Sequence, residues 1–191
     1  MKITDIINGK KYSLSFEVFP PKTSASVETV RQATEQIARL SPSYMSVTYG
    51  AGGGTSAYTL DVAKDLLSEG ITPLAHLSCV SSTKAEIRQR LDELHAAGIE
   101  NVLALRGDIP EGMNRDHLEY HYASELIEDI VRYGGFCIGG ACYPESHPES
   151  ETSFADIENL RRKVDAGCCF LTTQMFFDNN VFYNFLYRLR D

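Results

Sequence analysis

The chain has 191 residues, of which 43% are hydrophobic and 23% are charged. This balance is typical of a globular protein and excludes disordered, collagen-like and coiled-coil chains. The formal net charge is −8 and no basic patch stands out, so the sequence predicts neither nucleic acid nor an anionic membrane as a partner.

The cysteines and the N-terminus indicate the compartment. Five scattered cysteines, an odd number, do not have the spacing of a disulfide framework or a zinc ribbon. Residues 1–11 lack the apolar stretch of a signal peptide, and no run of about 18 apolar residues could span a membrane. We therefore expect a soluble, reduced, cytoplasmic protein.

A strand followed by a helix repeats along the whole chain. Short apolar runs predict six strands, near residues 13–19, 44–48, 72–77, 101–105, 137–141 and 170–173. Between them, Thr83 and Glu86 form a capping-box pattern at the start of one helix. Glycines suited to a left-handed turn end four helices, at Gly70, Gly98, Gly134 and Gly167.

This alternation predicts an α/β fold with a parallel sheet and right-handed crossovers. A doubly wound dinucleotide fold usually has G-x-G-x-x-G after its first strand, whereas here Phe19 is followed by two prolines. The glycine-rich loop 50–55 follows the second strand and lacks the Gly-Lys-Ser/Thr ending of a P-loop. We therefore predict a (β/α)8 TIM barrel, which takes about 250 residues when complete. About six of its βα units are present, in a single domain over residues 1–191 that is incomplete at its C-terminal end.

In a barrel the active site forms at the C-terminal ends of the strands. A carboxylate inside the apolar run 14–19 is costly to bury unless it is paired or protonated. Glu17 is therefore either a general acid or the partner of Arg106 in an ion pair across the barrel. His76 alone is by default a core histidine. Every predicted strand end nevertheless carries a polar group, which favours a site: Glu17, Thr48, His76, Arg106 with Asp108, Tyr143 and Gln174.

Other polar residues give weaker signals. The loop 143–149 places His147 between prolines, which makes it a modest candidate. Asp156 and Lys163 accompany the following helix, where a solvated face is the default. His117 and His121 have the i, i+4 spacing of a helical metal pair, but no third ligand accompanies them, so we expect no metal. From the residues alone we predict a barrel enzyme capable of acid–base chemistry, with an extended ligand over the strand ends.

Seven segments, taken together and in order, resemble the methylenetetrahydrofolate reductase family. They are SFEVFPPK at 15–22, SVTYG at 46–50, AHLSC at 75–79, LALRGDIP at 103–110, YPESHPE at 143–149, KVDAG at 163–167 and TQMFFD at 173–178. The resemblance implies a flavoprotein barrel that holds FAD at the strand ends. It also implies reduction of 5,10-methylenetetrahydrofolate to 5-methyltetrahydrofolate, with electrons passing from NADH or NADPH through FAD.

The same resemblance implies roles for individual residues. Glu17 would be the general acid that helps to open the folate imidazolidine ring to an iminium ion. Asp108 would lie near flavin and pterin and stabilise that cation, and Gln174 would position folate or nicotinamide. The residues that the resemblance places against FAD are Thr48, His76, Arg106, Gly107, Asp108, Tyr122, Ala123, Tyr143, His147, Asp156 and Lys163.

The end of the chain departs from the family pattern, because family members continue through two further βα units. We therefore expect either a truncated chain or a partner that covers the gap. The open barrel edge of the chain favours a homo-oligomer, since unpaired strand edges promote association. The alternative function is a flavin- or folate-binding barrel fragment that no longer turns over.

Overall fold

The structure is a computed structural model that describes residues 1–21, 23, 26–49, 56–109 and 112–190. The glycine-rich loop 50–55 lies outside these residues. Six strands form one sheet, in which every neighbouring pair is parallel and spatial order follows chain order. The strands are β1 (Ser15–Val18), β2 (Tyr44–Val47), β3 (Pro73–Ser78), β4 (Asn101–Leu105), β5 (Cys137–Cys142) and β6 (Phe170–Thr173).

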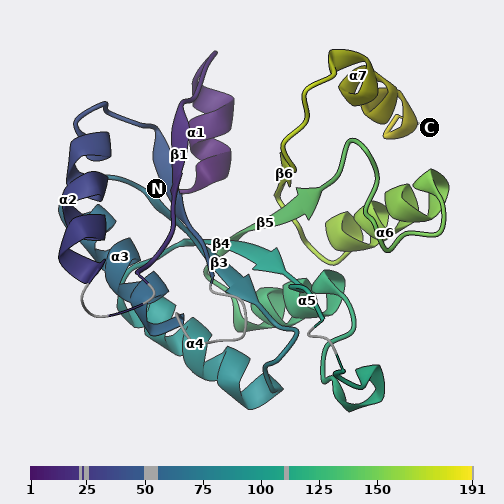
Figure 1. Cartoon of the computed structure of the whole chain (residues 1–191), viewed down its shortest axis with the longest axis horizontal. Helices are drawn as coiled ribbons and strands as arrows, with labels where there is room; N and C mark the ends of the chain where they lie inside the picture. Colours follow the sequence, from purple (N-terminus) through teal and green to yellow (C-terminus); the bar gives the residue numbers. More distant parts are fainter. Residues whose placement is uncertain (22, 24–25, 50–55, 110–111, 191) are drawn as a thin grey trace.

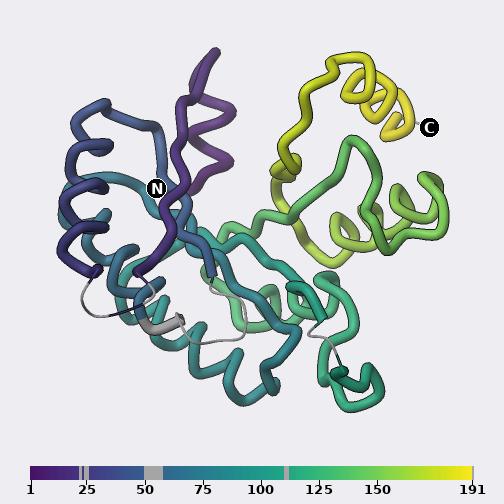
Figure 2. The backbone as a smooth tube through the Cα atoms, in the orientation of Figure 1, coloured from purple at the N-terminus to yellow at the C-terminus, as the bar shows by residue number. Residues whose placement is uncertain are grey.

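The predicted strands and their parallel order are confirmed, and the bounds of β4 and β6 coincide with the predicted ranges. The chain advances from each strand to its neighbour, so that β1 and β6 form the two edges of the sheet (Figures 1 and 2). The described residues thus form a six-stranded parallel partial barrel.

Helices connect successive strands. They are α2 (Val27–Ala38), α3 (Ser56–Ser68), α4 (Lys84–Ala96), α5 (Ala123–Tyr133) and α6 (Ser153–Asp165), with α1 (Ile3–Gly9) before the sheet, α7 (Asn179–Arg188) after it, and a 3-10 helix, η3 (Arg115–His117), before α5. The capping box of Thr83 and Glu86 is present at the start of α4. The glycines predicted to end four helices all have positive φ. None of the helices among the described residues is long and apolar enough to cross a membrane.

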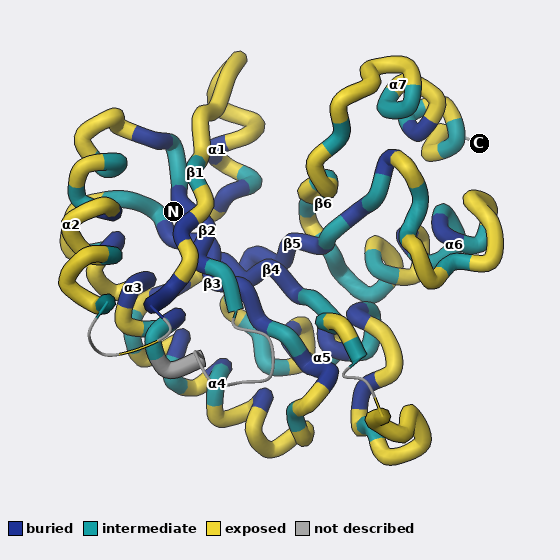
Figure 3. Tube along the Cα trace, in the orientation of Figure 1, coloured by how far each residue is buried: buried dark blue, intermediate teal, exposed yellow. Residues whose placement is uncertain are grey.

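The two faces of the sheet are buried in different ways, because alternate side chains of a strand point to opposite faces. One face packs against the connecting helices through residues such as Met45, Val47 and Leu77. Figure 3 shows that much of the chain along β3, β4 and β5 is buried. On the inner face, Leu74 and Leu103 pack against Ile3 of α1, which the sequence did not predict. The buried Asn101 side chain holds this helix, since Ile3 N donates to Asn101 Oδ1 at 2.9 Å. The C-terminal ends of β3, β4 and β5 carry polar residues that the sequence predicts for the site.

Candidate active site

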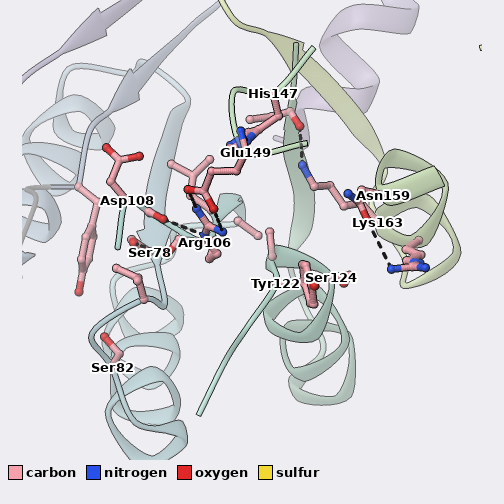
Figure 4. A pocket seen from close by; sticks show the side chains of 18 of the residues that line it. Ser78, Ser82, Arg106, Asp108, Tyr122, Ser124, His147, Glu149, Asn159 and Lys163 are labelled. Carbon is pink, nitrogen blue, oxygen red and sulfur yellow. Dashed lines mark hydrogen bonds and ion pairs between the residues drawn. The ribbon is translucent and has the colours of Figure 1, made fainter. Parts of the chain in front are cut away.

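A cavity of about 1150 Å³ opens at the C-terminal ends of β3, β4 and β5, between α4, α5 and α6. Pockets for small molecules measure roughly 300–1000 Å³, so this one has room for an extended ligand. Figure 4 shows side chains from separate elements facing this space. Nine of the predicted site residues line it: Arg106, Gly107, Asp108, Tyr122, Ala123, Tyr143, His147, Asp156 and Lys163.

Gly107 forms a close turn in the cavity wall just after β4. Its φ is +87°, which L side chains rarely adopt, and a Cβ at this position would collide with Ser78 Oγ. That hydroxyl is not free to move away, because it donates to Arg106 O at 2.9 Å. The backbone of Gly107 is therefore packed so closely against Ser78 that no larger residue fits at this point of the wall.

Arg106 and Glu149 form a two-pronged ion pair at the cavity. The Nη1 and Nη2 atoms of Arg106 donate to the two carboxylate oxygens of Glu149 at 3.0 and 2.5 Å. Hydrogen bonding to Arg106 lowers the pKa of Glu149, and the same contact raises the pKa of the guanidinium. The alternative in which Arg106 pairs with Glu17 is therefore wrong.

Helix α6 presents polar side chains to the cavity. Asp156 is buried and its Oδ1 accepts from Ser150 Oγ at 3.1 Å, so the default of a solvated helix face is wrong for this residue. Lys163 Nζ donates to Ala141 O at 2.7 Å, and burial lowers the pKa of this lysine. Asn159 and Arg162 also line the cavity, although no sequence motif singled them out. Asn159 lies three residues after Asp156 and four before Lys163, so its helical spacing was an available signal, whereas no such spacing from these two residues marks Arg162.

The N-terminus of α5 forms another part of the cavity wall. Tyr122 is its N-cap residue and makes no side-chain capping hydrogen bond. Tyr122, Ala123 and Ser124 line the cavity. Because the backbone N–H groups and dipole at a helix N-terminus favour negative charge, an anionic ligand group suits this position.

His147 is oriented by its own loop. Its Nδ1 accepts from Glu149 N at 3.1 Å, which leaves Nε2 as the donor of the neutral ring. The ring packs edge-on against Tyr143, with centroids 4.7 Å apart. The loop thus supplies an aromatic face and a directed hydrogen-bond donor side by side.

Glu17 and His76 lie together outside the cavity lining. The Glu17 side chain is 47% exposed, so its expected burial is wrong, because β1 is an edge strand that leaves one side open. His76 Nε2 lies 3.5 Å from Glu17 Oε2, but this nitrogen has no hydrogen-bond partner among the described residues. Burial lowers the pKa of His76 to about 4, so the ring is neutral at pH 7 and the contact is not an ion pair.

Thr48 and Gln174 also lie outside the cavity lining. Thr48 follows β2, and its neighbour Tyr49 lines the cavity instead. Gln174 is exposed, and its backbone N extends the pairing of β6 with β5 by donating to Cys142 O at 2.7 Å. The structure therefore brings most, but not all, of the predicted residues to one cavity.

The two histidines with metal-pair spacing do not share a helix, because η3 ends at His117 and His121 lies beyond it. The described residues contain no group of three His, Cys, Asp or Glu side chains placed to hold a metal ion.

A family model described as methylenetetrahydrofolate reductase matches residues 2–191. This chain belongs to the methylenetetrahydrofolate reductase family. It is 37% identical over 174 residues to the 5,10-methylenetetrahydrofolate reductase of Escherichia coli (strain K12), a match that covers 91% of this chain and 58% of that protein. It is 39% identical over 204 residues to methylenetetrahydrofolate reductase 2 of Schizosaccharomyces pombe, covering 97% of this chain and 31% of the relative. The chain therefore spans 58% of the length of the E. coli relative.

Solved structures share the fold of this reductase-family chain at low sequence identity. A Clostridium thermocellum protein that binds two copies of 5-methyl-5,6,7,8-tetrahydrofolic acid has a TM-score of 0.64 and 17% identity, over 98% of this chain and 62% of that one. A 2,3-dimethylmalate lyase has the same TM-score of 0.64 at 9% identity, over 98% of this chain and 66% of that one. At these identities the likeness supports the α/β fold alone.

Proposed function

We propose that this chain carries the flavin site of a methylenetetrahydrofolate reductase. In this proposal it reduces 5,10-methylenetetrahydrofolate to 5-methyltetrahydrofolate, with electrons from NADH or NADPH through noncovalently bound FAD. Membership of the family supports the reaction. The observation that carries the cofactor assignment is that nine of the eleven residues implied to contact FAD line one cavity.

The cavity fits a flavin dinucleotide on two grounds. Its volume of about 1150 Å³ accommodates an extended ligand. The N-terminus of α5 and the cations Arg115 and Lys163 line the same space and suit a diphosphate. The chemistry that FAD supplies when bound is hydride transfer between nicotinamide and folate.

Two carboxyl groups in different surroundings suit two different roles in this reaction. Glu17 lies beside the neutral His76 and would deliver a proton to the folate ring nitrogen as the ring opens. Asp108 lines the cavity and would offset the positive charge of the iminium ion. Gln174, exposed just beyond β6, would position folate or nicotinamide through its side-chain amide.

We also propose that the whole protein is a (β/α)8 barrel, because the six parallel strands suit a barrel that two further βα units complete. The homo-oligomer and the cytoplasmic location stay predictions, and light scattering coupled to size-exclusion chromatography tests the first.

Rapid mixing of the FAD-loaded chain tests the reaction in two halves. NADH or NADPH should bleach the flavin absorbance, and 5,10-methylenetetrahydrofolate should restore it under anaerobic conditions. If the chain binds FAD but catalyses neither half-reaction, the result favours the alternative function of a flavin- or folate-binding barrel fragment without turnover. Reduction of flavin by nicotinamide without reoxidation by the folate would contradict the folate reductase activity of this chain.

A further inference from the structure

Three separate segments around the cavity meet at one carboxylate. Arg106 follows β4, Arg115 lies in η3, and Glu149 lies in the loop between β5 and α6. Arg115 Nη2 donates to Glu149 Oε2 at 3.0 Å, the same oxygen that accepts from Arg106 Nη1. Glu149 therefore links both arginines, and with them both flanking segments, to its own loop. Figure 4 shows its contact with Arg106.

The Arg106–Glu149 pair differs from an ordinary surface ion pair. Exposed pairs contribute little because solvent screens them and ordering two long side chains opposes them. Here the Arg106 side chain is only 17% exposed, and both carboxylate oxygens accept from it. Its Nε also donates to Gly107 O at 3.0 Å, so three N–H groups fix the plane of the guanidinium. Such bidentate, charge-assisted geometry gives direction as well as energy.

The arrangement can act on a ligand in two opposite ways. The negative charge of Glu149 offsets two cations, which by itself weakens the binding of an anion. Its hydrogen bonds hold the same cations still, which strengthens binding because a preorganised group loses less entropy when the ligand arrives. The fixed geometry of Arg106, hydrogen-bonded on two sides, favours the second effect.

We propose that Glu149 is a positioning residue for the cofactor cavity, and that it sets the affinity for an anionic dinucleotide by holding Arg106 and Arg115 in place. The identity of the ligand as FAD rests on the proposed function. Glu149 itself stays paired with the two arginines when the ligand is bound, and no proton or bond is exchanged.

The test compares Glu149→Gln with Glu145→Gln. Both variants remove one negative charge from the same loop, but Glu145 lies outside the cavity lining and, among the described residues, forms no ion pair. FAD affinity is measured by flavin fluorescence quenching, and thermal melting of the ligand-free variants checks that each is folded. We expect Glu149→Gln to weaken FAD binding about tenfold, the value of one charge-assisted hydrogen bond. Glu145→Gln should change the FAD affinity by less than about twofold.

A second comparison shows whether Glu149 acts through Arg106. In an Arg106→Met background, the Glu149→Gln change should lose most of its effect on FAD affinity. An undiminished effect there, or tighter FAD binding in both Gln variants, would overturn the positioning role, because charge alone would then account for the data.

A ligand-free measurement separates this inference from the cofactor assignment. In ¹H–¹⁵N spectra, the Arg106 Nε–H signal, identified by its loss in Arg106→Met, should exchange slowly in the wild type and in Glu145→Gln. It should broaden or vanish in Glu149→Gln. If the wild type fails to bind FAD, the proposed function fails, and this signal decides the positioning of Arg106 on its own. An Nε–H signal unchanged by Glu149→Gln overturns the inference.

Discussion

The Ser46 hydroxyl donates to Glu17 Oε2 at 3.2 Å, and the two residues are register partners on the neighbouring strands β2 and β1. The buried Nε2 of His76, on β3, lies 3.5 Å from the same oxygen. Three adjacent strands thus define the position of one carboxyl group, although its side chain is partly open to solvent.

Replacing Glu17 by Gln should separate the two half-reactions. The amide keeps the size of the side chain but cannot deliver a proton, so folate reduction should fall by at least about 100-fold, as expected for loss of general acid catalysis. Flavin reduction by the nicotinamide donor should be spared, because it needs no proton from Glu17. Stopped-flow absorbance measures both in one preparation. Equal loss in both halves would contradict the assignment of Glu17 as the folate acid.

His76 should make the ligand-free chain less stable in mild acid. Its pKa is about 4 in the folded chain against 6.5 for an unperturbed imidazole, because burial opposes the charged form. Below pH 6.5 the unfolded chain takes up a proton that the folded chain refuses, so the free energy of unfolding falls as pH drops toward 4. The loss is at most about 3 kcal/mol.

Urea unfolding of His76→Gln as a function of pH measures this contribution. The variant should lack this part of the acid sensitivity, whereas a matched change at the exposed His117, His117→Gln, should retain it. If the free energy of unfolding depends on pH in the same way in the wild type and in His76→Gln, protonation of His76 does not destabilise the folded chain and the prediction is wrong.

The strands and their parallel order were predictable because both follow from local signals. Apolar runs of strand length alternate with helices that end at left-handed glycines such as Gly70 and Gly98. Helix α1 was not predictable in this way. It has seven residues, and its position depends on the distant Asn101.

The site was predictable to the extent that motifs mark strand ends. Which partner a charged residue selects is a tertiary property, as Arg106 shows by pairing with Glu149 at a separation of 43 residues rather than with Glu17. The exposure of the Glu17 side chain could likewise not be predicted, because it depends on whether a strand lies beside β1.

Gly107→Ala should destabilise the chain and weaken FAD binding. A Cβ there meets both Ser78 Oγ and the side chain of Val80, in addition to the strain of a positive φ. Gly70→Ala is the matched control, because Gly70 has a φ of +76° and a Cβ added to it would meet nothing within 4 Å. Strain alone should lower the free energy of unfolding by about 1–2 kcal/mol at Gly70. Urea unfolding measures both variants. A larger loss of unfolding free energy in Gly107→Ala than in Gly70→Ala would measure the cost of the close contact with Ser78. Equal losses in the two variants would show that this contact costs nothing.

Lys163→Met should weaken FAD binding by about tenfold, since it removes a cation that lines the cavity. Lys64→Met removes the same charge from an exposed position on α3 and should leave the affinity unchanged. Isothermal titration with FAD measures both. An equal loss of FAD affinity in both variants would show that net charge, rather than the position of Lys163, controls binding.

Titration of the purified chain with FAD tests whether the cavity over β3, β4 and β5 holds this cofactor. Flavin fluorescence should be quenched to a one-to-one endpoint, with a visible spectrum that shifts on binding, and Gly107→Ala should weaken the complex. Absence of binding both by this chain and by a version extended with two further βα units would contradict this cofactor assignment.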